Sequence, residues 1–216
     1  MNKTPLLSYT FRECLNPDCM FRFPAPTNLE KANICPRCHG QTKIVHTIQL
    51  LPDHDKDREQ DNPYHLEMVL DNIRSTFNVG AMFRTADGAG VKKIHLTGIT
   101  PPPEHTKVQK TALGAENTIP YHYHPNCVKA VSDLKKQGYY LIALEKTSTS
   151  TPLDSIHLQP HQPTAVVVGN EVAGVDPDVL ALCDAHIHIS MNGLKGSLNV
   201  AIAYGIAVYH LLSTQN

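Results

Sequence analysis

Residues 189–209 constrain the fold of this chain most: a short apolar segment leads through a small, polar loop into a helix that is apolar on almost every side. A helix without a polar face must be buried, either in its own core or against a partner subunit. We expect Ser197 to cap this helix, because a serine hydroxyl can accept a hydrogen bond from the first turn. The glycine-containing loop then lies between two buried elements, where its backbone can approach a small ligand closely. An ordinary strand–loop–helix connection is the alternative.

Strand-like and helix-like segments alternate after residue 63. The strand candidates are apolar or β-branched runs at 65–70, 93–97, 119–122, 139–144, 165–168 and 185–189. The helix candidates are 78–89, 126–137, 177–182 and 197–212. This alternation predicts an α/β domain with a mostly parallel sheet and helices on both faces.

Two further segments end in residues that suit a ligand site. Residues 164–168 form an uninterrupted run that stops at Gly169-Asn170-Glu171, as expected for a buried parallel strand that enters a loop. Residues 71–90 combine the end of a strand with a short helix that Asn78 is expected to cap and glycines to terminate.

Taken together, residues 71–90, 164–175 and 189–209 resemble, in order and spacing, the three sequence motifs of the SpoU class of RNA ribose 2′-O-methyltransferases, in the trefoil-knotted SPOUT superfamily. The resemblance covers about residues 64–212. It implies a C-terminal trefoil knot, which the alternation of elements does not predict and which is a rare exception among folds. It also implies a homodimer formed through the last helix, with candidate contacts at Tyr204, Val208 and Tyr209.

In that family S-adenosylmethionine binds in the knot, and its adenine is held mainly by backbone atoms. The resemblance implies cofactor contacts at Gly169, Asn170, Ile189, Met191 and Leu198. Ile189 and Leu198 would also suit ordinary core positions, because a backbone contact leaves the side chain free to pack.

The resemblance also implies a catalytic group, Arg84, surrounded by Asn78, Glu171, Ser197 and Asn199. The positive sulfur of the cofactor makes its methyl group electrophilic, so the reaction needs no metal and no covalent intermediate. Ser197 and Asn199 would orient the ribose or a phosphate, and Glu171 would hold Arg84.

Two roles are open for Arg84. Family accounts make the arginine a general base, but a guanidinium keeps its proton in nearly all settings. A protonated Arg84 would instead bind a phosphate and stabilise negative charge on the ribose oxygen. The alternative is that Arg84 has no catalytic role and is a surface arginine that pairs with Asp87 on the same helix.

Contacts to RNA phosphates are expected from cations near the same motifs. Residues 105–116 resemble the family's loop after the second strand of this domain, and the candidates are Arg74, Lys107 and Lys110. Solvated lysines without a ligand are the alternative.

Four of the six cysteines form two close pairs near the N-terminus. Cys14 and Cys19 have four residues between them, Cys35 and Cys38 have two, and 15 residues separate the pairs. This spacing is typical of a zinc ribbon with four thiolate ligands. Two disulfides in a secreted module are the main alternative, and the absence of a signal peptide disfavours them.

The predicted domains follow from this division. Residues 1–50 would be a zinc ribbon that docks RNA, residues 51–63 a polar linker, and residues 64–216 the methyltransferase domain. Lys43 to Leu50 is the one strand expected in the ribbon.

Composition limits the partners and the location of the chain. The 19 basic and 20 acidic residues give a net charge of −1, so nucleic-acid binding would need a local basic patch. The longest apolar run is too short to span a bilayer and the N-terminus has no apolar signal core, so we expect a soluble, cytoplasmic protein without membrane contact.

The sequence therefore predicts an RNA 2′-O-ribose methyltransferase that acts on tRNA or rRNA, uses S-adenosylmethionine and carries a structural zinc ion. A catalytically silent RNA-binding or assembly factor on the same fold is one alternative. A non-enzymatic zinc adaptor is another, but it leaves the three motifs unexplained.

Overall fold

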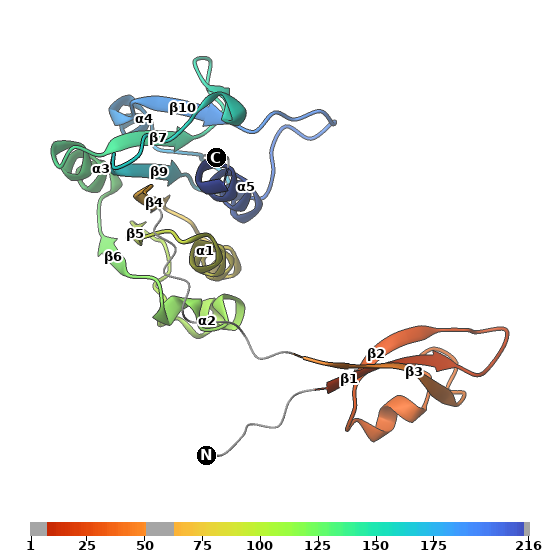
Figure 1. Ribbon diagram of the computed structural model, residues 1–216. Coiled ribbons are helices and arrows are strands. Elements are labelled where there is room, and N and C mark those ends of the chain that lie inside the picture. Colours follow the sequence, from red (N-terminus) through yellow and green to blue (C-terminus); the bar gives the residue numbers. More distant parts are fainter. Residues whose placement is uncertain (1–7, 51–62, 214–216) are drawn as a thin grey trace. The chain divides into compact units, whose positions relative to one another are not determined.

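The computed structural model describes residues 8–50 and 63–213. The chain divides into two compact units, residues 1–60 and residues 61–216 (Figure 1). Nearly all of the predicted linker, residues 51–62, lies outside the described residues.

The N-terminal unit is built on a three-stranded antiparallel sheet with the order β2-β1-β3. Its elements are β1 (Ser8–Cys14), β2 (Arg22–Pro26), the 3-10 helix η1 (Glu30–Asn33) and β3 (Thr42–Gln49). Thr10, Arg12 and Cys14 alternate along β1 and are buried, so one face of this sheet carries the core of the unit.

The C-terminal unit contains a seven-stranded sheet with the order β6-β5-β4-β9-β7-β10-β8. Every neighbouring pair runs parallel, as the alternating pattern predicts. Its strands are β4 (Leu66–Asp71), β5 (Lys93–Thr97), β6 (Tyr121–His124), β7 (Tyr140–Leu144), β8 (Thr151–Pro152), β9 (Thr164–Val168) and β10 (Ala185–His188).

Helices cover both faces of this sheet (Figure 1). They are α1 (Thr76–Ala89), α2 (Thr106–Ala112), α3 (Cys127–Lys136), α4 (Pro177–Leu182) and α5 (Val200–Ser213), with 3-10 helices η2 (Ala115–Asn117) and η3 (Leu153–Ser155). Met68 and Leu70 of β4 join the core under α1, α2 and α5, whereas Val69 between them joins the core under α3 and α4. Alternation along the central strands thus builds two apolar layers.

The predicted caps of α1 and α5 are wrong by a few residues. Ser75, not Asn78, caps α1: its Oγ accepts a hydrogen bond from the Asn78 N–H at 3.3 Å. Asn199, not Ser197, caps α5: its Oδ1 accepts from the Ala201 N–H at 2.9 Å. Serine and asparagine are nearly equal as N-caps, so the sequence alone does not choose between neighbouring candidates.

Helix α2 lies within residues 105–116, for which the family resemblance implies a loop, and its Val108 and Ala112 are buried against the core. It packs so closely on α1 that a Cβ added to Gly80 would lie 2.0 Å from Thr111 Oγ1 and 2.4 Å from the Val108 carbonyl oxygen. Gly80 is therefore required by the α1–α2 contact.

No helix among the described residues has the length and apolar character needed to cross a bilayer.

Candidate active site and cysteine cluster

A cavity of about 340 Å³ opens beyond the carboxyl ends of β7, β9 and β10. Ligands of parallel α/β folds bind at this edge of the sheet. Its wall consists of residues 144–146, 169–172, Gly174, His188, Ile189, Met191, residues 196–200 and Ala203.

All five residues predicted to contact a cofactor lie in this wall: Gly169, Asn170, Ile189, Met191 and Leu198. Three of the five predicted catalytic residues, Glu171, Ser197 and Asn199, lie there as well. The structure thus brings residues from the second and third motifs to one cavity, although they are up to 30 positions apart in the sequence.

The loop after β9 is held tightly. A Cβ added to Gly169 would lie 2.2 Å from the backbone of Gly174, so only glycine fits there. Asn170 Oδ1 accepts from the N–H groups of Val172 and Ala173, each at 3.0 Å, and its Nδ2 donates to the Asn72 carbonyl oxygen at 2.7 Å. Asn170 therefore closes its own loop and ties it to the end of β4.

A chain of hydrogen bonds joins the three motifs. Asn78 Nδ2 donates to Glu171 Oε1 at 3.0 Å, and Asn199 Nδ2 donates to Asn78 Oδ1 at 3.2 Å. Each residue belongs to a different motif, so the first turn of α1, the loop after β9 and the start of α5 are fixed relative to one another.

Glu171 also receives hydrogen bonds from the two residues that precede α1. Its two oxygens accept from the Arg74 and Ser75 N–H groups, both at 3.0 Å. Burial alone would raise the pKa of this carboxyl, but these N–H groups and Asn78 hold the pKa below its ordinary value. A carboxylate at the N-terminus of a helix is also favoured by the helix dipole.

Arg84 lies apart from this network. It is exposed on α1 and does not line the cavity, and no described residue forms a hydrogen bond or ion pair with it. The expected pairing of Glu171 with Arg84 is wrong: Glu171 Oε2 lies 3.9 Å from Arg74 Nε instead. Asp87, the alternative partner, accepts from the Thr118 hydroxyl at 2.6 Å.

Glu145 is a site residue that sequence reasoning missed. Its Oε2 accepts from the Val175 N–H at 3.1 Å, and its side chain lines the cavity beside Lys146. Its position in the sequence could have indicated this role, because Glu145 directly follows the apolar strand β7, and ligands bind at the carboxyl ends of parallel strands.

The three predicted RNA contacts are all exposed. Arg74 lies at the start of α1 beside Glu171, whereas Lys107 and Lys110 lie on α2 rather than in a loop.

The exposed face of α5 differs from the predicted one. Tyr204 and Val208 are fully buried within the chain, so they cannot be contacts to a partner subunit. Tyr209 is 50% exposed, and Ile202 and Ile206, which share its face, are 56% and 42% exposed. An apolar stripe of these three residues therefore faces outward in the single chain.

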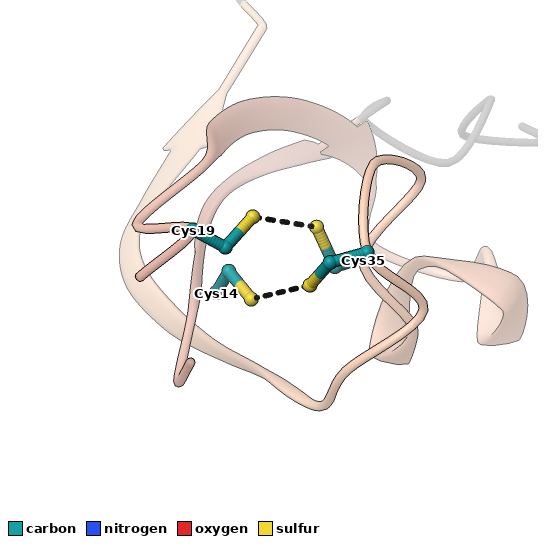
Figure 2. A group of neighbouring side chains, drawn as sticks. Cys14, Cys19 and Cys35 are labelled. Atoms are coloured by element: carbon teal, nitrogen blue, oxygen red, sulfur yellow. Dashed lines mark hydrogen bonds between the residues drawn. The ribbon is translucent and has the colours of Figure 1, made fainter. Parts of the chain in front are cut away.

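The four N-terminal cysteines bring their sulfur atoms together (Figure 2). The Sγ atoms of Cys14 and Cys38 are 3.4 Å apart, those of Cys19 and Cys35 are 3.9 Å apart, and all four lie within 4.8 Å of one another. Zn–S bonds of about 2.3 Å in a tetrahedron put neighbouring sulfurs about 3.8 Å apart. The cluster thus has the dimensions of a four-thiolate zinc site.

Backbone N–H groups favour thiolates in this cluster. The Asn16 N–H donates to Cys14 Sγ at 3.4 Å. Burial raises the pKa of the Cys35 thiol, but the N–H groups of Cys38 and Arg37, together with the thiols of Cys38 and Cys14, lower it to about 7. The Asn16 N–H lowers the pKa of Cys14, but burial and the neighbouring thiols raise it to about 12.

Comparison with known families agrees with this geometry. The sequence profile of the SpoU rRNA Methylase family matches residues 65–209, which is most of the chain and includes the whole wall of the cavity. The chain belongs to the SpoU family.

Curated relatives of this SpoU protein include two bacterial enzymes. The chain is 29% identical over 144 residues to "tRNA (guanosine(18)-2'-O)-methyltransferase" of Escherichia coli (strain K12), with 67% of this chain and 61% of that protein covered. It is 32% identical over 144 residues to "23S rRNA (guanosine(2553)-2'-O)-methyltransferase RlmP" of Bacillus subtilis (strain 168), with 67% and 56% covered. The SpoU protein thus spans about three-fifths of the length of these relatives.

Among solved structures, the AdoMet-bound rRNA methyltransferase from Sinorhizobium meliloti is similar, with a TM-score of 0.63 at 29% identity. The similarity covers 69% of this chain and 57% of that chain.

Proposed function

We propose that this SpoU protein transfers a methyl group from S-adenosylmethionine to a ribose 2′-hydroxyl of tRNA or rRNA. The observation that carries the proposal is the cavity at which the family segments meet, joined by the hydrogen bonds from Asn199 to Asn78 and from Asn78 to Glu171. The names of the curated relatives support the same reaction class.

The cavity suits S-adenosylmethionine in its chemistry. Leu144, Ile189 and Leu198 give it an apolar wall for a purine ring, and the glycine-containing loops offer backbone groups for the edge of the ring. Glu145 and Lys146 lie on the same wall and suit a ligand that carries both positive groups and a carboxylate. Binding in a trefoil knot remains a prediction from the family resemblance.

S-adenosylmethionine supplies, when bound, an electrophilic methyl group on a positively charged sulfur. The chain must then hold the ribose hydroxyl in line with that methyl and stabilise negative charge on the oxygen. We assign the positioning to Asn78, Ser197 and Asn199. Glu171 stays ionised at neutral pH, because its pKa is lowered, and it holds the first turn of α1 in place.

We assign Arg84 to the RNA and to charge stabilisation. Its exposed guanidinium has no described partner that would compete with a phosphate. A guanidinium remains protonated at neutral pH, so its direct contribution is positive charge near the reacting oxygen.

A homodimer would cover the apolar stripe of Ile202, Ile206 and Tyr209. Phe77 of α1 is 57% exposed and lies seven residues before Arg84, on the same face of that helix. Burial of this surface would place Arg84 at or near the subunit interface.

The cysteine cluster would hold one structural zinc ion through Cys14, Cys19, Cys35 and Cys38. The spacing of the sulfurs and the backbone N–H donors support this assignment. The N-terminal unit would then serve as a docking module for RNA, and Arg74, Lys107 and Lys110 would contact phosphates near the active site. A cytoplasmic location remains a prediction.

The test is methyl transfer in vitro. The purified chain is incubated with methyl-labelled S-adenosylmethionine and with RNA from cells that lack its gene. We expect label at positions where the RNA chain resists alkali, because a 2′-O-methyl group blocks attack by the ribose oxygen on the phosphate. Label in bases alone would contradict the proposal. Binding of RNA and cofactor without transfer would identify a silent RNA-binding protein.

A further inference from the structure

The N-terminal sheet has one covered face. Arg12, on this face, donates from Nη2 to Asn33 Oδ1 at 2.7 Å, and the Thr42 hydroxyl donates to the Ala32 carbonyl oxygen at 2.7 Å. Both acceptors belong to η1, so η1 packs against this face.

The opposite face, which we call the open face, carries nine residues in three rows set by the strand register. The rows, each written in the order β2, β1, β3, are Pro26–Tyr9–Ile48, Pro24–Phe11–His46 and Arg22–Glu13–Lys43. Directly paired residues of antiparallel strands share one face of the sheet. All nine are exposed or partly exposed among the described residues, and Ile48 is 41% exposed.

A β-bulge creates this arrangement. Phe11 pairs with His46 and Arg12 pairs with Ile44, so Val45 is the extra residue of β3. Without it, strict alternation would place His46 on the face opposite to Lys43. The bulge therefore brings the imidazole of His46 beside Phe11 and keeps Lys43 on the same surface.

The charged row is positive overall. Glu13 lies 3.1 Å from Lys43 Nζ and 4.0 Å from Arg22 Nη1, so one carboxylate holds two cations at the two edges of the sheet. Both cations remain about half exposed, with 46% of the Arg22 and 56% of the Lys43 side chain accessible. Two partly exposed aromatic rings share this face with the cations: Phe11 lies in the row next to Arg22 and Lys43, and Tyr9 lies one row further along β1.

We propose that the open face docks a single-stranded segment of RNA, with bases stacked on Phe11 and Tyr9 and phosphates near Arg22 and Lys43. Aromatic side chains on a sheet surface bind unpaired bases by stacking, because every base has a flat π-face. The cations add attraction for the backbone, which a purely apolar protein partner would not require. This inference rests on the proposed function only in taking RNA as the substrate.

The experiment measures binding of a fluorescent ten-nucleotide oligouridine to the full, zinc-loaded chain by anisotropy. Phe11→Ala and Tyr9→Ala should each weaken binding about fivefold or more, the scale of losing one stacked base. Ile44→Ala is the matched control: Ile44 is 53% exposed on the same sheet but shares the face of Arg12, so binding should not change. Zinc content and the melting profile verify that each variant is folded.

Two further readouts make the result decisive. Lys43→Ala should reduce the dependence of binding on salt by about one phosphate contact. Amide NMR signals of β1 should shift when the oligonucleotide is added. Unchanged affinity in both aromatic variants, or signal changes confined to residues 63–213, would overturn the proposal. S-adenosylmethionine binding and methyl transfer test the proposed function separately. The docking inference and the proposed function can therefore fail independently of each other. A protein that binds the open face should compete with RNA. Binding of such a protein without displacement of RNA would also contradict the inference.

Discussion

Glu171 and Asn199 each bond to backbone groups, and the side chain of Asn78 forms a hydrogen bond with each of them. Glu171 holds the first turn of α1, Asn199 caps α5, and the Asn78 amide joins the two. Asn78 and Asn199 suit this role because short side chains lose less entropy than long ones when they are fixed. The polar region of the site is therefore preorganised before any ligand binds.

Substitution of Arg84 tests whether the chain is an enzyme or only a binding protein. Arg84→Ala should leave S-adenosylmethionine affinity near wild type, because Arg84 does not line the cavity. Methyl transfer should fall about 100-fold or more, or roughly 3 kcal/mol of transition-state stabilisation. Calorimetry and single-turnover kinetics measure the two effects.

The conservative variant distinguishes the two roles of Arg84. Arg84→Lys keeps the charge and loses the planar geometry, so partial activity would favour charge stabilisation over proton abstraction. A wild-type rate for Arg84→Ala on the true RNA substrate would refute the assignment.

A second polar cluster lies away from the cavity, around the buried carboxylate of Glu67. Glu67 is 2% exposed and accepts hydrogen bonds from His95 at 2.7 Å, and from His65 and Tyr139 at 2.9 Å each. Burial would raise its pKa, but these bonds lower the pKa from 4.5 to about 2. Nearby, burial and the neighbouring His95 lower the pKa of His124 from 6.5 to about 4.

These pKa shifts predict loss of stability in acid. A lowered pKa stabilises the fold above the unfolded-state value, and the contribution is lost as pH falls through the folded-state value. For Glu67 the loss should reach about 3 kcal/mol between pH 4.5 and pH 2. Urea unfolding at a series of pH values, followed by helical circular dichroism, measures it. Glu67→Gln should have a lower free energy of unfolding at neutral pH, and that free energy should change less between pH 4.5 and pH 2. The same pH dependence in Glu67→Gln and the wild type would contradict the account.

At the scale of elements, α1 and α2 depend on a glycine at their contact. Gly80→Ala should destabilise the C-terminal unit by several kcal/mol, because the added methyl would overlap Thr111 and the Val108 backbone. Gly205→Ala in α5 is the matched control: its Cβ would lie 3.6 Å from Thr85, an ordinary contact, and alanine is the better helix former. Equal thermal stability of the two variants would show that α1 and α2 pack less closely than described.

The exposed apolar stripe of α5 predicts a homodimer. Ile206→Asp should convert a wild-type dimer into a monomer, because a charge would replace an apolar residue in the covered stripe. Leu113→Asp, at a residue 66% exposed beyond α2, should leave the dimer intact. Light scattering at micromolar concentration distinguishes these results, and a monomeric wild-type chain would refute the interface.

Several elements could be predicted from the sequence because their patterns are strong. Strand β9, a β-branched run, was predicted at 165–168 and spans Thr164–Val168. The amphipathic helix α3 was predicted at 126–137 and spans Cys127–Lys136. Helix α2 was missed because only Val108 and Ala112 of its seven residues are buried, too few to set a period. The caps and the Glu171–Arg74 pair depend on tertiary geometry that local sequence does not encode.

At the scale of the whole molecule, the two units should respond independently to loss of metal. Cys35→Ser should abolish zinc binding and unfold the N-terminal unit, because a domain this small lacks a sufficient apolar core. The helical circular dichroism should persist, since α1 to α5 all belong to the C-terminal unit with its own core.

Cys183→Ser is the control, because Cys183 lies outside the cluster. Elemental analysis should give one zinc per chain for the wild type and for this control. Wild-type protein that is purified without chelator, with free thiols and no zinc, would contradict the assignment.

Membership of the SpoU family, the cavity and the polar network support the central proposal that this chain methylates RNA ribose. The most direct measurement maps 2′-O-methylation across cellular RNA with and without the gene. We predict at least one tRNA or rRNA position that loses its methyl group on deletion, regains it with the wild-type gene, and does not regain it with Arg84→Ala. An identical methylation map in cells with and without the gene, while the protein is expressed, would contradict the claim.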